Sequence, residues 1–285
     1  MHTSPTRQGR MFDVLNHVTL GVLGLIMFIP FVYVVITSFS TESTAWPSTF
    51  TLDTYKYIFS TSTFIRSIGV SFYITVLGTA LSLLSTSLMA YALSYRSLPG
   101  RSKIMLMILF TMLFNGGMIP TYLVVKEMHM IDTTWSLMIP GLISAFYLIV
   151  LRDFFSGVPL ELIESAKIDG AHEVTVLLRI VLPLSLPALA AFGLFYAVGI
   201  WNQYFNAILY INSPEKWPVQ VILRQIVILA SGGIGDSGNA GENVAYYGQG
   251  VKMAVIVVST FPIMIVYPFL QKHFAKGALL GSVKG

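Results

Sequence analysis

Six long stretches without a single Asp, Glu, Lys or Arg constrain this chain more than any other feature. They are bounded by Asp13 and Glu42, Arg66 and Arg96, Lys103 and Lys126, Asp132 and Arg152, Arg179 and Glu215, and Lys252 and Lys272. A helix rises about 1.5 Å per residue, so roughly 20 apolar residues cross a bilayer core of about 30 Å. Each stretch is long enough for one crossing, and none comfortably holds two. The pattern predicts an all-α membrane protein with six transmembrane helices, near residues 16–39, 68–94, 104–125, 134–151, 184–207 and 253–271.

Composition excludes the main soluble classes. Charged residues make up 11% of the chain, against roughly 25% in an ordinary soluble domain, and the mean hydropathy is +0.74. This balance argues against a soluble enzyme and a disordered chain. The 17 basic residues are scattered, so no Lys/Arg tract is available to bind the phosphates of a nucleic acid. Cysteine is absent, which excludes disulfides and thiolate metal sites.

The distribution of basic residues predicts the orientation in the membrane. Six spans place both termini on one side, and a cytoplasmic assignment puts eleven Lys and Arg inside and six outside. This agrees with the positive-inside rule. The external segments are then 40–67 and 208–252, and the glycine-rich run 231–241 is either a mobile loop or a contact for an external partner. The first apolar run is too long for a signal peptide, so we expect a retained helix.

The cytoplasmic loop 152–180 contains five of the thirteen acidic residues. Pro159 and Glu161 predict a helix start, and Gly170 predicts its end. A second helix is expected from Ala171 until Pro183 interrupts it. The 3–4 spacing places one set of residues on roughly one face of this elbow: Glu161, Glu164, Ser165, Ile168 and His172. The elbow is either a solvated linker or a knob that docks into a cytoplasmic partner.

One motif in this loop is specific. The sequence Glu164-Ser165-Ala166, three residues, Gly170, nine residues, Ile180, one residue and Leu182-Pro183 resembles the EAA signature of bacterial ABC-importer permeases. Ser165 replaces the alanine that is usual there. In that family the loop sits in a cleft of the ATP-hydrolysing subunit. The resemblance therefore implies a set of ATPase-coupling residues: Glu161, Glu164, Ser165, Ala166, Ile168, Asp169, Gly170 and His172.

Three further segments, 115–122, 131–135 and 201–204, resemble the carbohydrate branch of the family, most closely its permeases for complex oligosaccharides and polysaccharides. An alginate importer is one candidate within it. The signature-bearing region covers about residues 66–275 of a single transmembrane permease domain, 1–285. The resemblance implies the type I importer architecture in the bacterial cytoplasmic (inner) membrane. It also implies three kinds of protein partner: a second homologous permease, two ATP-binding subunits and an extracytoplasmic solute-binding protein. ATP and Mg would be bound by the ATPase subunits, and this chain is expected to bind no cofactor.

Polar residues within apolar spans tend to face the interior of a helix bundle. Amides and aromatic rings there would suit a sugar, because rings pack on C–H faces and amides hydrogen-bond to hydroxyls. The candidate substrate-path residues are Asn115, Tyr147, Trp201, Asn202, Gln203, Tyr204 and Asn206. An aromatic belt at the outer interface is the alternative for 201–206, and a helix kink is the alternative for 115–117. Pro183 and Pro187 predict that the fifth span is kinked.

The charge-free spans also exclude two membrane functions. An ion-coupled transporter normally needs an ionisable group at membrane depth, and the only histidine inside these stretches, His17, lies at the entrance to the first. An intramembrane enzyme would need a catalytic or metal-binding cluster there. No phosphate-binding loop is present, so ATP hydrolysis must come from a partner. The sequence predicts a non-enzymatic permease subunit of an ATP-driven importer for oligosaccharides or polysaccharides. The alternatives are a permease of this class for a non-sugar solute and a non-transporting membrane scaffold.

Overall fold

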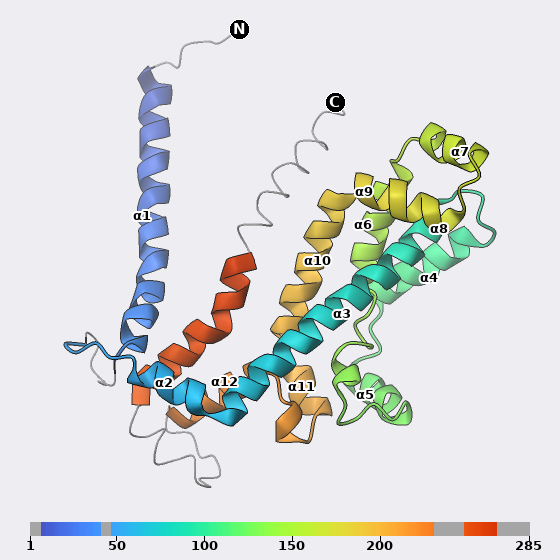
Figure 1. Cartoon of the computed structure of the whole chain (residues 1–285). Coiled ribbons are helices and arrows are strands. Elements are labelled where there is room, and N and C mark those ends of the chain that lie inside the picture. Colours follow the sequence, from blue (N-terminus) through green and yellow to red (C-terminus); the bar gives the residue numbers. More distant parts are fainter. Residues whose placement is uncertain (1–6, 41–46, 231–247, 267–285) are drawn as a thin grey trace. The chain divides into compact units, whose positions relative to one another are not determined.

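The computed structural model describes residues 7–40, 47–230 and 248–266, and every regular element in these ranges is a helix (Figure 1). The prediction of an all-α chain is confirmed. The helices form two compact units: the described parts of residues 1–62 with 223–260, and those of 63–222 with 261–285. The glycine-rich run 231–241 and the last part of the predicted sixth span, 267–271, lie outside the described residues.

The first unit contains α1 (Arg7–Ser38), α2 (Asp53–Ser60), the end of α12 (Val219–Ala230) and most of the C-terminal helix Gly248–Val266. The end of α1 is tied to α2, because the Ser38 and Tyr55 hydroxyls lie 2.7 Å apart. The C-terminal helix approaches closely at Gly250, where an added Cβ would lie 1.9 Å from the carbonyl oxygen of Ser40. Only glycine fits this contact.

The second unit is built along α3 (Ser62–Ser94), which is continuous for 33 residues. After α3 the chain forms α4 (Arg101–Leu113) and α5 (Met118–Glu127), which meet at a bend of 119°. The 3-10 turn η1 (Thr134–Leu137) and α6 (Ala145–Ser156) follow. The elbow region contains α7 (Leu160–Ile168), α8 (Glu173–Val176), the π-helical turn η2 (Leu177–Val181) and α9 (Leu182–Leu184). The unit continues with α10 (Leu186–Trp201), α11 (Phe205–Tyr210) and the 3-10 turn η3 (Pro214–Lys216).

Among the described residues, three helices are long and apolar enough to cross a membrane: Met11–Ser38, Ser62–Ser94 and Gly248–Val266. Counting each bent pair as one span gives up to five, the second pair being Glu173–Leu184 with Leu186–Trp201, bent by 85°. This bend lies between Pro183 and Pro187 and confirms the predicted kink. The count of six spans stays a prediction.

The charge-free stretch between Asp132 and Arg152 does not form one continuous helix. η1 ends at Leu137 and α6 begins only at Ala145. Pro140 and Gly141 stand between them, and proline and glycine both disfavour a helix interior. The expected fourth span, 134–151, is therefore a short turn, an irregular segment and a helix of 12 residues.

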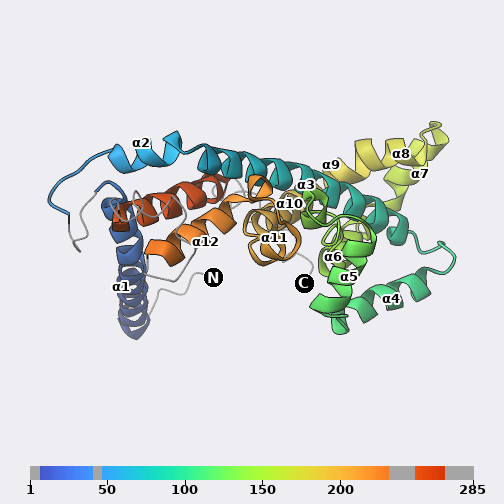
Figure 2. The ribbon, with the colours of Figure 1, turned by 90° about the horizontal axis from the view of Figure 1, so that it is seen from below.

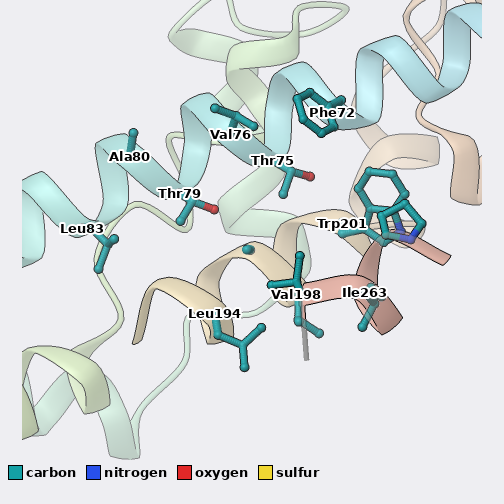
Figure 3. Close-up of a pocket in the computed structure, with 13 residues that line it drawn as sticks. Phe72, Thr75, Val76, Thr79, Ala80, Leu83, Leu194, Val198, Trp201 and Ile263 are labelled. Carbon is teal, nitrogen blue, oxygen red and sulfur yellow. The ribbon is translucent and has the colours of Figure 1, made fainter. Parts of the chain in front are cut away.

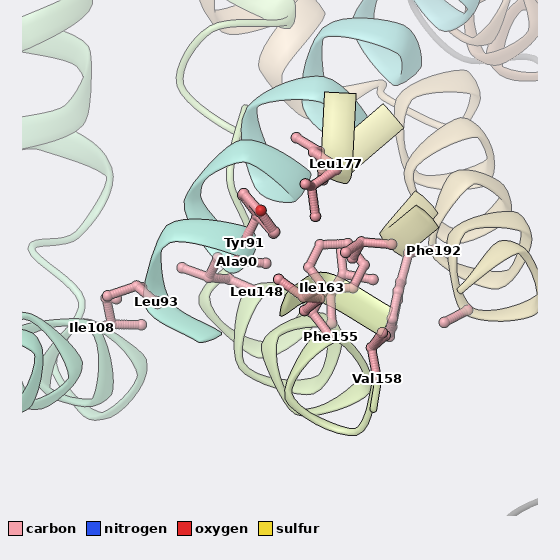
Figure 4. Close-up of a cluster of buried hydrophobic side chains, with 14 residues drawn as sticks. Ala90, Tyr91, Leu93, Ile108, Leu148, Phe155, Val158, Ile163, Leu177 and Phe192 are labelled. Carbon is pink, nitrogen blue, oxygen red and sulfur yellow. The ribbon is translucent and has the colours of Figure 1, made fainter. Parts of the chain in front are cut away.

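Two hydrophobic clusters pack on α3. One joins its C-terminal part to α4, α6, the elbow and α10, and Ile163 and Leu177 from the elbow point into it beside Tyr91 (Figure 4). The other joins Ile74 to Val125, Met138 and Tyr210. The elbow lies at the C-terminal end of α3 in both views (Figures 1 and 2), and Figure 1 shows α5 and α11 at the other end of this unit.

Asp132 connects two loops beside α11. Its backbone is left-handed, with φ of +58°. One carboxylate oxygen accepts hydrogen bonds from the backbone N–H groups of Asn212 (3.1 Å) and Ser213 (2.8 Å). The other accepts from the Ser213 hydroxyl (2.6 Å) and from Lys216 Nζ (3.0 Å). These hydrogen bonds, the Ser213 hydroxyl first, hold the pKa of Asp132 well below its usual range.

Candidate functional site

The elbow runs from Pro159 to Leu184, and its first part, Pro159 to Glu173, contains the predicted turn between two helices. Pro159 occupies the N-cap of α7, and two hydrogen bonds end the helix: Gly170 N–H donates to the carbonyl of Lys167 (3.1 Å), and Ala171 N–H donates to that of Ala166 (2.9 Å). This is the Schellman arrangement, which requires a left-handed residue, and Gly170 supplies a φ of +84°. The prediction that Gly170 ends the first helix is confirmed. The second helix begins at Glu173 rather than Ala171, because His172 takes the N-cap position.

One side of α7 packs inward and the other is exposed. Ile163 is buried and Ala166 is half-buried, and both contact the cluster at the end of α3. The other residues expected to couple to the ATPase are all exposed: Glu161, Glu164, Ser165, Ile168, Asp169, Gly170 and His172. Ile168 is 87% exposed, which is unusual for an isoleucine at the end of a helix. The outer side of the elbow thus presents an apolar side chain among carboxylates.

Four polar side chains attach the elbow to α3, and we call Tyr91, Tyr95, Lys167 and Glu173 the Glu173 cluster. One carboxylate oxygen of Glu173 accepts hydrogen bonds from the hydroxyls of Tyr91 (2.7 Å) and Tyr95 (2.9 Å), and the other pairs with Lys167 Nζ at 2.5 Å. The ammonium of Lys167 also lies 5.0 Å from the centre of the Tyr95 ring. The hydrogen bond to Glu173 raises the pKa of Lys167. The cluster therefore joins α7, α8 and the end of α3.

The sequence did not reveal this cluster. Glu173 counted only as one of the acidic residues of the loop, and its hydroxyl partners lie 78 and 82 residues earlier. The available signal was local: Tyr91 and Tyr95 are four residues apart, so they share one face at the end of a predicted span.

The predicted residues 201–206 lie where the helix breaks between α10 and α11. Trp201 is buried, and the Asn202 side chain donates to the carbonyl of Val198 (2.9 Å). Gln203 Nε2 donates to the carbonyl of Leu137 (2.9 Å), while its buried Oε1 has no hydrogen-bond partner within the described residues. Tyr204 is half-buried and Asn206 is exposed. Two of the amides at this break therefore bind backbone carbonyls, and the substrate-path role of 201–206 stays a prediction.

A cavity of about 480 Å³ lies within the second unit beside Trp201, between α3, α10 and the last turns of the C-terminal helix from residue 262 (Figure 3). Its wall is mainly apolar: Phe72, Val76, Ala80, Leu83, Leu194, Ala197, Val198, Pro262, Ile263 and Val266. Thr75 and Thr79 add two buried hydroxyls, which make no hydrogen bond within the part of the chain that the structure describes. Of the seven expected substrate-path residues, Trp201 alone is among those that line this cavity.

Tyr147 and Asn115 lie elsewhere in the second unit. Tyr147 is half-buried against α10, with its ring centre 5.3 Å from Phe192 and 4.9 Å from Tyr196. The Asn115 side-chain oxygen accepts a hydrogen bond from Gly117 N–H (2.8 Å) at the bend between α4 and α5. These contacts give Tyr147 a packing role and Asn115 a bend-forming role, and neither joins the 201–206 group.

Known proteins share both the sequence and the fold. Residues 82–279 match the family described as binding-protein-dependent transport system inner membrane component. Protein LplC of Bacillus subtilis (strain 168) is 54% identical over 98% of this chain and 97% of its own length. The polygalacturonan/rhamnogalacturonan transport system permease protein YtcP of the same organism is 52% identical over 98% of this chain and 100% of its own.

Two solved structures are also similar. A bacterial ABC transporter involved in the import of the acidic polysaccharide alginate contains a chain with a TM-score of 0.88 and 31% identity, covering 95% of this chain and 99% of that one. A bacterial alginate ABC transporter in complex with an alginate pentasaccharide-bound periplasmic protein shares the fold alone, with a TM-score of 0.56 and 16% identity.

Proposed function

This chain belongs to the family of binding-protein-dependent transport system inner membrane components, and we propose that it is the permease subunit of an ATP-driven importer of oligosaccharides or polysaccharides. The observation that carries the proposal is the exposed elbow at the end of α3. A short helix with a fixed end, presenting Ile168 and carboxylates outward, is suited to a partner that moves. The EAA-like spacing of Glu164, Gly170 and Pro183 within this elbow supports an ATPase subunit as that partner.

The same assignment gives a membrane topology. We place six spans in the cytoplasmic membrane with both termini on the cytoplasmic side, in agreement with the excess of basic residues there. The elbow is then cytoplasmic and the loops joined by Asp132 are external. Their positions at opposite ends of the second unit support this topology (Figure 1).

The partners follow from the chemistry that this chain lacks. A second homologous permease would supply the other half of the path, and two ATPase subunits would bind ATP and Mg. An extracytoplasmic binding protein would deliver the solute, and the alginate transporter that shares this fold is described with such a periplasmic protein. ATP binding would draw the ATPase subunits together, and the elbow would pass this movement to the helices.

A saccharide is the solute class supported best. YtcP is named for transport of polygalacturonan and rhamnogalacturonan, and the alginate importer for an acidic polysaccharide. Trp201 contributes an aromatic ring to the cavity wall, and such rings pack on the C–H faces of sugars. None of the described residues that line the cavity is charged, so we infer that an acidic sugar would take its counter-charges from a partner subunit.

Reconstitution with all partner subunits tests the solute class. The complex is placed in proteoliposomes, and its binding protein is loaded in turn with oligosaccharides of polygalacturonan, of alginate and of a neutral glucan. We expect at least one saccharide to stimulate ATP hydrolysis and to enter the vesicle. Stimulation and uptake with a non-sugar solute, and with none of the saccharides, would contradict the proposal.

Charge reversal on the elbow tests the docking role. Glu164→Lys should abolish uptake and weaken association of the ATPase subunits, because an exposed carboxylate becomes an ammonium on the docking surface. The chain itself should stay in the membrane. Glu127→Lys is the matched control, since it makes the same change at an exposed glutamate of α5, far from the elbow. Equal ATPase association in the two variants would show that the elbow is not the docking surface.

A further inference from the structure

We propose that Glu173 is a positioning residue that fastens the elbow to α3, so that movement of the elbow is passed along α3 to the cavity. This inference rests on the proposed transport function and adds the physical link between the ATPase surface and the path. The residue that makes the link is not one of those expected from the EAA-like motif.

The contacts of Glu173 run in two directions. Oε1 faces Lys167 in the last turn of α7, and Oε2 faces Tyr91 and Tyr95 at the end of α3. The two tyrosine rings meet edge to face with their centres 5.2 Å apart, and the hydroxyl oxygens lie 2.6 Å apart. A displacement of α7 or α8 away from α3 would have to break hydrogen bonds to a charged group, which are stronger than those between neutral groups.

The other contacts between the elbow and α3 are apolar. Ile163 and Leu177 pack in the same cluster as Tyr91, and such contacts resist separation but permit sliding. The hydrogen bonds to the Glu173 carboxylate are directional, so they also resist sliding and fix the register between α8 and the end of α3. Removing the hydroxyls while keeping the rings should therefore affect coupling more than folding.

α3 connects the Glu173 cluster to the cavity. α3 is continuous from Ser62 to Ser94 and contains no proline, so it can act as a stiff rod. Thr79 and Leu83 line the cavity on this same helix, and Thr79 precedes Tyr91 by about 18 Å of helix. A tilt of the cytoplasmic end of α3 would thus move one wall of the cavity directly.

The test uses two variants in the complete complex, reconstituted with its partner permease, ATPase subunits and binding protein. Glu173→Gln keeps the size of the side chain and removes its charge. Tyr91→Phe/Tyr95→Phe keeps the rings and removes both hydroxyls. Tyr73→Phe is the matched control, since it removes a hydroxyl from an exposed position of α3 outside the cluster. Three quantities are measured: subunit association, ATP hydrolysis with and without loaded binding protein, and solute uptake per ATP.

We expect both variants to assemble and hydrolyse ATP. Uptake per ATP should fall by at least about tenfold, because one hydrogen bond to a charged group is worth about that factor and the tyrosine variant loses two. Combining all three substitutions should give no further loss, because they break one link. Tyr73→Phe should match the wild type. Uptake per ATP within twofold of the wild type in both variants would overturn the link. If the complex with Glu173→Gln fails to assemble, the single variant Tyr95→Phe is measured instead, and uptake per ATP within twofold of the wild type would again overturn the link. A wild-type complex without saccharide uptake would instead overturn the proposed function.

Discussion

At the scale of single residues, Asp132 makes a testable contribution. Its carboxylate accepts four hydrogen bonds from Asn212, Ser213 and Lys216, and it thereby joins two loops. Asp132→Asn removes the charge and replaces one acceptor oxygen by a donor, so the loops should separate more easily. We expect a lower thermal unfolding temperature in detergent solution. Glu127→Gln, a neutralised exposed carboxylate on the preceding helix, should leave it unchanged, and equal temperatures for the two variants would contradict this role.

The same residue predicts a pH dependence. The pKa of Asp132 is depressed in the folded protein, so its contribution to stability is complete above the ordinary value of 3.8. As the pH falls below that value, the unfolded chain takes up the proton first, and the contribution is lost through the depressed folded pKa. The difference in unfolding temperature between wild type and Asp132→Asn should therefore shrink below about pH 4. A difference that is constant from pH 7 to pH 3 would assign the effect to something other than this carboxylate.

The residues that the sequence could and could not identify differ in the range of their interactions. The role of Gly170 was predictable because the end of a helix is determined by neighbouring residues in the sequence. Glu173 was not, since its partners Tyr91 and Tyr95 are brought to it by the packing of α3 against the elbow. The position of Thr75 and Thr79 beside the cavity was missed for the same reason. The neighbouring sequence does not indicate whether a threonine in an apolar helix faces a cavity, lipid or another helix.

At the scale of elements, the length of each stretch without charged residues predicted that helices are present. It did not predict whether each helix is continuous. α3 spans its stretch unbroken, whereas the stretches that contain Asn115-Gly116-Gly117 and Pro140-Gly141 are interrupted. A missing charge says only that a segment tolerates an apolar environment. Whether it remains helical depends on glycine and proline, and on side chains such as Asn115 that satisfy the freed backbone.

The end of α7 makes an element-scale prediction. Gly170→Ala forces a Cβ into the left-handed region, at a cost of about 1 kcal/mol. Gly170→Pro also removes the N–H that donates to Lys167. We expect ATP hydrolysis stimulated by loaded binding protein to fall moderately in the first variant and completely in the second. Gly69→Ala in α3, where the added Cβ would meet nothing within 4 Å, serves as the control. Normal stimulation in Gly170→Pro would show that the turn does not matter for coupling.

At the scale of the whole molecule, α3 contacts the elbow at its C-terminal end and lines the cavity with its middle turns. One group of polar and charged contacts, the Glu173 cluster, lies where α3 meets the elbow, and the mainly apolar cavity lies further along the same helix. Such a division suits a subunit that receives force at one place and handles solute at another. On the proposed function, few charged residues suffice because they are needed at the ATPase-docking surface and in the connecting loops rather than in the path.

This division predicts that changes at the cavity and changes at the elbow have separable effects. Trp201→Phe replaces the indole on the cavity wall with a smaller benzene ring, so the maximal rate of uptake should fall. The KM of uptake for the loaded binding protein should stay the same. Stimulation of ATP hydrolysis should be retained, because the elbow and the Glu173 cluster are intact. Trp135→Phe, the same change at a half-exposed tryptophan of η1, is the control. Transport rate and stimulated hydrolysis are measured on the same proteoliposomes. Parallel loss of both in Trp201→Phe, with Trp135→Phe normal, would show that the cavity and the elbow cannot be separated and that Trp201 acts in coupling instead.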